Sequence, residues 1–231
     1  MSNNPKHNLT YQLTHDLGNA IVKGKYKIGE GLPTEAELCT EYDVSRSATR
    51  EAVKMLSAKG LIVSRPKKGI RVLPESNWNM FDTDVLTWIL SSNPSLSLLK
   101  SFTEVRAAIE PQAAALAATN ATFEDIEEIE KALTRMKQSE KGLDDHLDSD
   151  IAFHTAVLKA SGNCFIMQLS DFISTALRVS IRYTNKIKGE EGDIEKHADI
   201  LDTIKSRNPE KAHHAVKAIL DEALELINSN L

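Results

Sequence analysis

Hydrophobic residues recur at intervals of three and four positions along almost the whole chain, which predicts a mainly α-helical protein. The interval breaks between Leu61 and Leu73, where two short aliphatic runs flank the turn sequence Pro66-Lys-Lys-Gly69. Such runs around a turn predict a β-hairpin. Up to residue 90 we expect helices at 9–23, 34–41, 46–58 and 82–90. Beyond it we expect helices at 96–118, 123–140, 143–160, 164–185, 192–206 and 209–228.

The stretch 34–60 predicts two short helices joined by a tight turn. Thr34 and Glu37 have the spacing of a capping box at the start of the first helix, and Ser45 is a favourable N-cap for the second. The first turns of the second helix carry Ser-Arg-Ser-Ala-Thr-Arg, and such side chains bind guanine edges and phosphates when a helix enters the DNA major groove. The alternative is that Ser45 only caps the helix and the arginines are solvated. The side chains that we expect to contact DNA from this stretch are Thr34, Ser45, Arg46, Ser47, Thr49 and Arg50.

The hairpin after the second helix favours the DNA-binding interpretation, because a hairpin in this position is the wing of a winged helix. Lys67, Lys68 and Gly69 at its turn would lie against the DNA backbone or in the minor groove. Residues 1–73 contain 12 Lys and Arg against 7 Asp and Glu, whereas the whole chain has a net charge of −5. A basic N-terminal segment followed by an acidic remainder is typical of a protein that binds DNA through its N-terminal domain.

These patterns predict a fold in three parts. Residues 1–73 would form a winged helix-turn-helix domain, and 74–81 a linker without periodicity. Residues 82–231 would form an all-α domain, and its short connections predict an antiparallel bundle. The aromatic residues near the junction, Trp78, Phe81 and Trp88, are expected to pack between the two domains.

Composition limits the class of protein. The chain has 231 residues, enough for two domains, and its 41% hydrophobic and 26% charged content is that of a folded globular protein. Cys39 and Cys164 both lie in apolar helical surroundings, so we expect reduced core thiols and no disulfide framework. No signal peptide or membrane-spanning run is evident. A cytoplasmic location without membrane partners is therefore expected.

Four ionisable side chains lie on helix faces that should be buried. Asp150 and His154 are one turn apart on an apolar stripe, and His197 and Arg106 each lie on another. Buried without a partner, each would cost several kcal/mol. In one interpretation they form an internal network, in which Arg106 is paired with a carboxylate. In the other they line a polar cavity, in which Asp150, His154 and His197 hold a divalent metal such as Zn²⁺ and Arg106 binds an anionic ligand.

Residues 9–73 resemble the GntR family of bacterial transcription regulators. The resemblance rests on Ile21-Val-Lys-Gly-Lys-Tyr-Lys-Ile-Gly-Glu-Gly-Leu-Pro-Thr-Glu-Ala-Glu-Leu38 and on the helix-turn-helix and hairpin that follow. It implies that Arg46 and Arg50 contact bases and phosphates. Many relatives carry an arginine where this chain has Ala36, so the operator sequence cannot be inferred from them.

Residues 80–229 resemble the all-helical effector-binding domain of the FadR subfamily. The junction 78–88 is similar to that of regulators of hexonate catabolism. The sequences that carry the resemblance are Glu104-Val-Arg-Ala-Ala-Ile-Glu-Pro111, Asp150-Ile-Ala-Phe-His154 with Ser161-Gly-Asn163, and Glu195-Lys-His197-Ala-Asp-Ile-Leu201.

The subfamily resemblance also implies a metal site. Asp150, His154 and His197 match three of the metal ligands that many relatives use, but the fourth position is Ile219. Arg178 lies on a polar stripe of a helix that lines the effector cavity in the subfamily, which makes it a secondary candidate for effector contact.

We therefore expect a homodimeric, ligand-responsive regulator that binds double-stranded operator DNA and is not an enzyme. It would repress genes for sugar-acid (aldonate or hexonate) catabolism until a carboxylate effector binds. The alternatives are a regulator that responds to another small organic acid and a DNA-binding dimer with a purely structural body. A metal-dependent hydrolase built on Asp150, His154 and His197 is disfavoured, because no nucleophile motif accompanies them.

Overall fold

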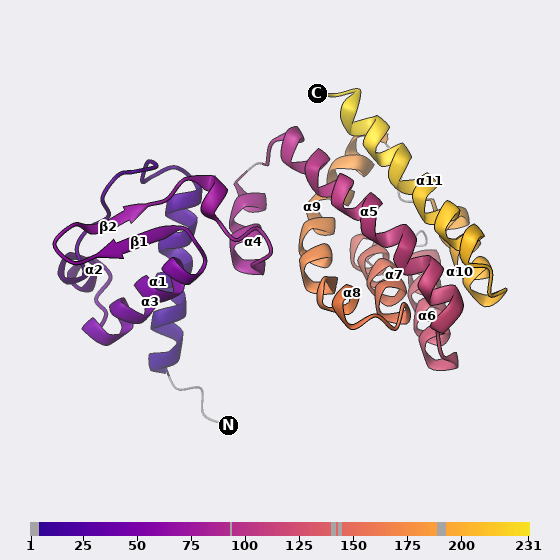
Figure 1. Ribbon diagram of the computed structural model, residues 1–231, viewed down its shortest axis with the longest axis horizontal. Coiled ribbons are helices and arrows are strands. Elements are labelled where there is room, and N and C mark those ends of the chain that lie inside the picture. The colour runs from indigo at the N-terminus through magenta and orange to yellow at the C-terminus, as the bar shows by residue number, and fades with distance from the viewer. Residues whose placement is uncertain (1–4, 93, 140–141, 143–144, 189–192) are drawn as a thin grey trace. The chain divides into compact units, whose positions relative to one another are not determined.

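The computed structural model describes residues 5–92, 94–139, 142, 145–188 and 193–231 (Figure 1). The chain forms two compact units, Met1–Asn93 and Pro94–Leu231, which we call the head and the body. Within the described residues, no helix combines the length and the apolar character needed to cross a bilayer.

The head is a helix-turn-helix followed by a β-hairpin. Leu17, Leu38 and Leu56, from three different helices, are completely buried in its core. Its helices and strands are α1 (Pro5–Val22), α2 (Glu35–Glu41), α3 (Arg46–Ala58), β1 (Ile62–Arg65), β2 (Gly69–Val72), the 3₁₀ helix η1 (Glu75–Asn77) and α4 (Thr83–Ser91).

Local capping starts both helices of the helix-turn-helix, as the sequence predicted. The backbone N–H of Thr34 donates to the Glu37 carboxylate at 2.7 Å, and the backbone N–H of Glu37 donates back to the Thr34 hydroxyl at 3.3 Å. The Ser45 hydroxyl accepts from the backbone N–H of Ala48, which starts α3. Each contact satisfies a backbone N–H that the first helical turn leaves without a partner.

The predicted wing is confirmed. Strands β1 and β2 pair antiparallel, with Ile62 opposite Val72. The turn between them needs positive φ angles, 63° at Lys67 and 73° at Gly69, and glycine adopts this conformation without strain. The chain before α2 runs along the hairpin, because the backbone N–H of Leu32 donates to the Ile70 carbonyl at 2.9 Å.

The boundary between head and body differs from the predicted one. Helix α4 was expected to open the body, but it belongs to the head and packs on α1. Trp78 and Trp88 are buried in the head core and are not junction residues. Trp88 can pack against α1 because residue 18 is a glycine. A Cβ at Gly18 would lie only 2.3 Å from the Trp88 ring.

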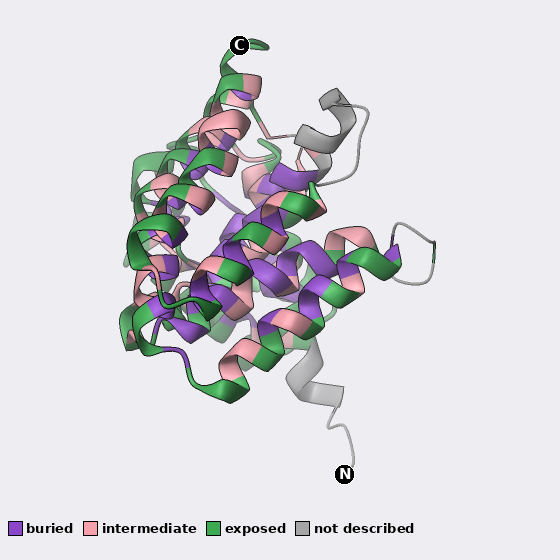
Figure 2. Cartoon of the chain, turned by 90° about the vertical axis from the view of Figure 1, so that its right-hand side faces the viewer, coloured by how far each residue is buried: buried purple, intermediate pink, exposed green. Residues whose placement is uncertain are grey.

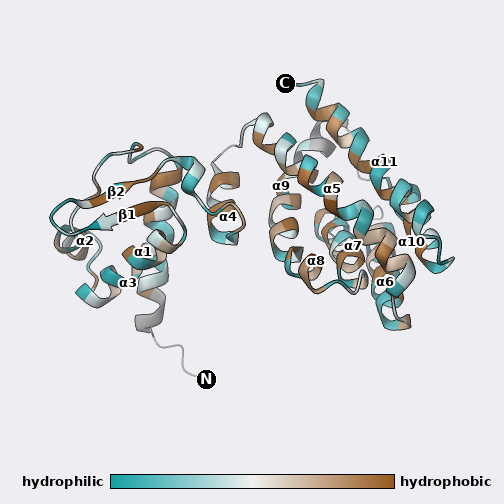
Figure 3. Cartoon of the chain, viewed as in Figure 1, coloured by the Kyte–Doolittle hydropathy of each residue, from teal (hydrophilic) through white to brown (hydrophobic). Residues whose placement is uncertain are grey.

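The body is a bundle of helices whose inner faces are buried, as the colouring of Figure 2 shows, and mainly hydrophobic, as the colouring of Figure 3 shows. Helix α5 packs along α11 and α7, while α6 and α9 pack on α7. Helix α5 contributes Ala113, Ala114, Ala117 and Ala118, all fully buried. The body helices are α5 (Leu96–Asn120), α6 (Phe123–Ser139), α7 (His146–Ala160), α8 (Cys164–Gln168), α9 (Ser170–Lys188), α10 (Ile194–Lys205) and α11 (Pro209–Asn228).

The helix expected at 164–185 divides into α8 and α9 at Leu169. The starts expected at Leu143 and Gly192 and the end expected at Glu140 lie outside the described residues. Cys164 was expected in the core but is exposed at the start of α8, whereas Cys39 is half-buried.

Candidate functional site

Helix α3 presents a polar surface for DNA. Arg46, Ser47 and Arg50 are exposed along its N-terminal half. Arg50 Nε donates to Glu35 Oε2 at 3.1 Å, so the carboxylate on α2 orients this guanidinium in the free protein. The exposed hydroxyls of Thr34 and Ser45 cap α2 and α3.

Thr49 was predicted to contact DNA, but this prediction is wrong for the free protein surface. Its side chain is fully buried and does not belong to the exposed surface of α3. Its hydroxyl donates to the Ser45 carbonyl at 3.2 Å and lies 3.2 Å from Cys39 Sγ on α2. It therefore packs α3 against α2. The sequence held this signal, since residues 49, 52, 53 and 56 share one face of the helix.

The wing adds one basic group, Arg65, that the sequence reasoning did not select, beside Arg71, which it did. Lys67, Lys68 and Gly69 lie exposed at its turn, as expected. A hollow of about 330 Å³ runs beside the turn and is lined by Lys68 and Gly69 together with Arg65, Arg71 and Val63. Arg65 was missed because it ends a strand just before the turn.

In the body, the structure brings four of the predicted ionisable residues into one buried cluster and adds a fifth, Glu110. Arg106 Nε and Nη2 donate to the two carboxylate oxygens of Glu110 at 2.6 and 3.2 Å. Arg106 is therefore not an unpartnered cation, because an acid one helical turn away holds its guanidinium. The i, i+4 spacing on a buried stripe was the available signal for this pair.

His154 connects the Arg106–Glu110 pair to Asp150. Its Nδ1 lies 3.0 Å from Glu110 Oε2, and its Nε2 lies 3.2 Å from Asp150 Oδ1. Burial lowers the pKa of His154, but the charge of Glu110 and the contact with Asp150 outweigh burial and raise it to about 9. Burial raises the pKa of Glu110, but Arg106 and His154 lower it to about 2. The contacts with two imidazoles also hold the pKa of Asp150 well below its ordinary value, although burial opposes this.

His197 completes the cluster from α10. Its Nδ1 lies 2.7 Å from the Asp193 carbonyl oxygen, which can only accept, so Nδ1 carries a proton. In the neutral ring, Nε2 then has a lone pair, and it lies 3.6 Å from Asp150 Oδ1. Within the described part of the chain, Asp150 Oδ1 and His197 Nε2 are buried and make no hydrogen bond of normal geometry.

This donor set fits a divalent metal. One ligand atom each from Asp150, His154 and His197 lies within 4.8 Å of the others. Carboxylate and imidazole are ligands of Zn²⁺ and similar ions, and a histidine ligand usually donates its second ring N–H to an acceptor. Glu110 and the Asp193 carbonyl are such acceptors. At the fourth ligand position of relatives, Ile219 is packed against the hydrophobic core.

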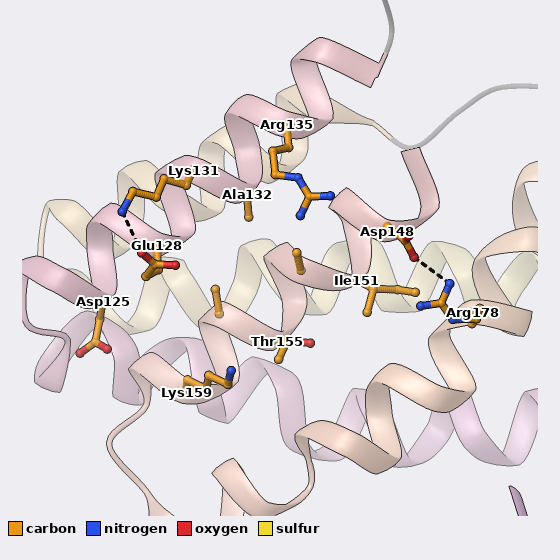
Figure 4. Close-up of a pocket in the computed structure, with 12 residues that line it drawn as sticks. Asp125, Glu128, Lys131, Ala132, Arg135, Asp148, Ile151, Thr155, Lys159 and Arg178 are labelled. Carbon is orange, nitrogen blue, oxygen red and sulfur yellow. Dashed lines mark hydrogen bonds and ion pairs between the residues drawn. The ribbon is translucent and has the colours of Figure 1, made fainter. Parts of the chain in front are cut away.

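Arg178 lies apart from this cluster. Its side chain is half exposed on α9, and its Nη1 donates to Asp148 Oδ1 at 2.7 Å on the outer surface of the body (Figure 4). The structure therefore does not bring Arg178 together with Asp150, His154 and His197.

Comparison with known proteins finds one matching family model in each of the two units. Residues 9–72 match the family model of bacterial regulatory proteins, gntR family, and residues 101–222 match the FCD domain. The chain is 36% identical over 217 residues to the galactonate operon transcriptional repressor of Escherichia coli K12, covering 92% of this chain and 94% of that protein. It is 30% identical over 215 residues to the Glc operon transcriptional activator of the same strain, covering 89% and 83%.

Solved structures show the same fold. One is Lar, which controls the agr system of Listeria monocytogenes, with a TM-score of 0.59, 18% identity, and coverage of 95% of this chain and 96% of that one. Another is a GntR regulator from Rhodococcus sp. RHA1, with a TM-score of 0.52, 19% identity, and coverage of 96% and 98%. The chain therefore belongs to the GntR family, in the FadR-like subfamily that joins a winged helix-turn-helix to an FCD effector-binding domain, and it is a ligand-responsive DNA-binding transcription regulator.

Proposed function

We propose that this regulator represses an operon for the catabolism of a sugar acid, an aldonate or hexonate, and that the acid releases it from its operator. The similarity to a galactonate operon repressor over nearly the full length of both chains supports the substrate class. The arrangement of the two histidines around Asp150 carries the proposal, because it favours a cation and, through that cation, an anionic effector.

The metal-binding part of the proposal follows from the orientation of the rings. His154 and His197 each have Nδ1 beside an acceptor and Nε2 beside Asp150, so both Nε2 atoms and the Asp150 carboxylate would hold the ion. The metal would supply a positive centre that binds carboxylate and hydroxyl oxygens. Three protein ligands leave room in its coordination for oxygens from another molecule.

The charge of the loaded cluster selects an anion. Arg106 and Glu110 neutralise each other, and metal binding requires His154 and His197 to be neutral. Asp150 then cancels only half of a divalent charge, so one positive charge remains in a buried space. A monocarboxylate would balance this charge, whereas a neutral sugar would leave it uncompensated.

Arg106 has a supporting role in this proposal. It holds Glu110, and Glu110 in turn holds His154 Nδ1, so the guanidinium sets the orientation of a metal ligand. Effector binding at the metal would alter the contacts of α7 and α10, which carry the ligands, and thereby change the arrangement of the two heads in a dimer. DNA affinity can change only by the difference in effector affinity between the two arrangements.

Titration of the operator complex with acids tests the proposal. DNA from upstream of the chain's own gene would be labelled, and release of the protein followed by fluorescence anisotropy with a panel of aldonic and uronic acids. We expect one acid to weaken DNA binding about 5- to 150-fold, the usual range of allosteric coupling. Metal-stripped protein and His197→Ala should lose most of this response but still bind DNA. An unaltered response in both would place the effector elsewhere, and an acid that strengthens DNA binding would contradict release of the protein by its effector.

A further inference from the structure

A carboxylate lies directly beside one of the arginines expected to contact DNA. Glu35, in the first turn of α2, accepts a hydrogen bond from Arg50 Nε of α3 at 3.1 Å. The side chains of Arg50 and Glu35 are 68% and 39% exposed, so the pair lies on the surface of the head. We propose that Glu35 is a positioning residue, which sets the base specificity of this regulator through Arg50 without contacting a base. The proposal rests on Arg50 reading a base and is independent of the metal and of the effector.

The hydrogen bond to Glu35 leaves the outer end of the guanidinium free. An arginine carries one N–H on Nε and two on each of Nη1 and Nη2. Glu35 accepts from Nε, and among the described residues Nη1 and Nη2 of Arg50 have no hydrogen-bond partner. These two nitrogens form the fork that binds O6 and N7 of a guanine. Glu35 therefore holds Arg50 by the atom that is not needed for this contact.

The position of Glu35 is fixed by α2 and by the packing of α2 on α3. Thr34 caps α2, and the partial positive charge at a helix start favours an acidic residue in the first turn. Thr49, which directly precedes Arg50, is buried, and its hydroxyl lies 3.2 Å from Cys39 Sγ on α2. The carboxylate thus approaches Arg50 from a packed helix. A guanidinium that is oriented before binding loses less side-chain freedom when it meets a base.

The charge of Glu35 also acts on DNA that lacks the correct base. On such DNA, Arg50 would turn toward a phosphate, and it would have to leave the carboxylate to do so. The carboxylate itself repels phosphates that come close to it. Specificity is a difference between two affinities, so a group that supports the correct contact and penalises the others increases it. Loss of Glu35 should therefore weaken operator binding and strengthen binding to random DNA.

Affinities for two duplexes test this role in the full chain. The operator would be selected with the wild-type protein from a library of random duplexes, so the test does not depend on the proposed operon. Fluorescence anisotropy then measures the affinity for this operator and for a scrambled duplex at one salt concentration. Glu35→Met removes both the acceptor and the charge. It should weaken operator binding about fivefold and strengthen binding to the scrambled duplex about threefold.

Two further variants separate orientation from charge. Glu35→Gln keeps an acceptor for Arg50 Nε, so it should strengthen scrambled binding as Glu35→Met does but weaken operator binding less. Glu51→Met is the matched control, because Glu51 directly follows Arg50 but pairs with Lys54 at 3.4 Å. It should shift both affinities in the same direction. Exposed ion pairs contribute little to stability, so all three variants should keep the urea midpoint of the wild type. Shifts in the same direction on both duplexes for Glu35→Met would overturn the proposal.

Modified guanines show whether Glu35 acts through Arg50. Replacing each operator guanine in turn by 7-deazaguanine, which lacks the N7 acceptor, identifies the base that Arg50 reads. At that base, the loss of affinity should be about fivefold or more in the wild type, absent in Arg50→Ala and reduced in Glu35→Met. Adding Glu35→Met to Arg50→Ala should cause no further loss of operator affinity, since no guanidinium remains to be oriented. A further loss in this double variant, or equal guanine dependence of the wild type and Arg50→Ala, would overturn the proposal.

Discussion

At the scale of single residues, hydrogen-bond partners decide what each imidazole of the cluster can do. A carbonyl holds the His197 Nδ1 proton, and a carboxylate lies beside His154 Nδ1, so both rings turn Nε2 toward one aspartate. Glu110 is central to this arrangement because it contacts both Arg106 and His154. In the proposed metal site, the Glu110 carboxylate would therefore act on the ligand His154 without itself binding the ion.

Replacing Glu110 should therefore weaken metal binding. Glu110→Gln removes the charge beside His154 Nδ1 and should reduce Zn²⁺ affinity by about 10- to 100-fold, the usual effect of losing such a supporting group. Competition with a chromophoric chelator would measure the affinity. Glu104→Gln, an exposed change on the same helix, is the control. Equal affinities in the two variants would show that Glu110 has only a structural role.

On the DNA-binding surface, Arg46 offers the clearest test because it is exposed on the first turn of α3. Arg46→Ala should cost about 1–3 kcal/mol of operator binding, with little effect on random DNA, if the guanidinium reads a base. Lys54→Ala, farther along the same helix, should change operator binding much less. Anisotropy titrations with operator and scrambled duplexes compare the two. Equal losses on both duplexes would assign Arg46 to the phosphate backbone.

At the scale of elements, close packing attaches α4 to the head. Lys59 at the end of α3 donates to Asp82 and Asp84 at the start of α4, at 2.7 and 2.8 Å. Trp88 of α4 lies over Gly18 of α1. Helix α3 is therefore linked by direct contacts to α4, the last helix of the head.

Adding a side chain at Gly18 should disrupt this packing. Gly18→Ala would place its Cβ against the Trp88 ring and should destabilise the head by about 1–3 kcal/mol. Gly31→Ala is the control, because its Cβ would have no neighbour closer than 3.8 Å. Urea unfolding followed by tryptophan fluorescence reports on the head alone, since both tryptophans of the chain lie there. If the urea midpoint of Gly18→Ala equalled that of Gly31→Ala, the Trp88 ring would move aside without loss of stability.

At the scale of the whole molecule, we propose that two heads act together on one operator. A single winged helix contacts few base pairs, so a two-fold operator bound by a dimer provides the specificity that a repressor needs. We propose that the body provides most of the dimer contact. Effector binding within the body can then act on both heads at once.

Sedimentation of the two units tests this arrangement. Residues 94–231 alone should sediment as a dimer, and residues 1–93 alone as a monomer that binds operator weakly. The full chain, measured beside them, should be dimeric. A monomeric body beside a dimeric full chain would move the dimer interface to the head.

The amino-acid sequence by itself determined the helix-turn-helix, the wing and the mainly helical body. Caps such as Thr34 and Ser45, the Lys67–Gly69 turn and the helical periodicity act between residues a few positions apart, so they can be recognised without coordinates. The burial of Thr49 was equally local, although the polar side chain concealed it.

Only the tertiary structure decided which distant residues meet. His197 joins Asp150 and His154 because α10 and α7 pack into one bundle, and Glu110 joins them from α5. The same holds for Trp88 against Gly18 and for Glu35 beside Arg50. Local patterns show which face of a helix is buried, but the partner of that face depends on how the whole chain packs.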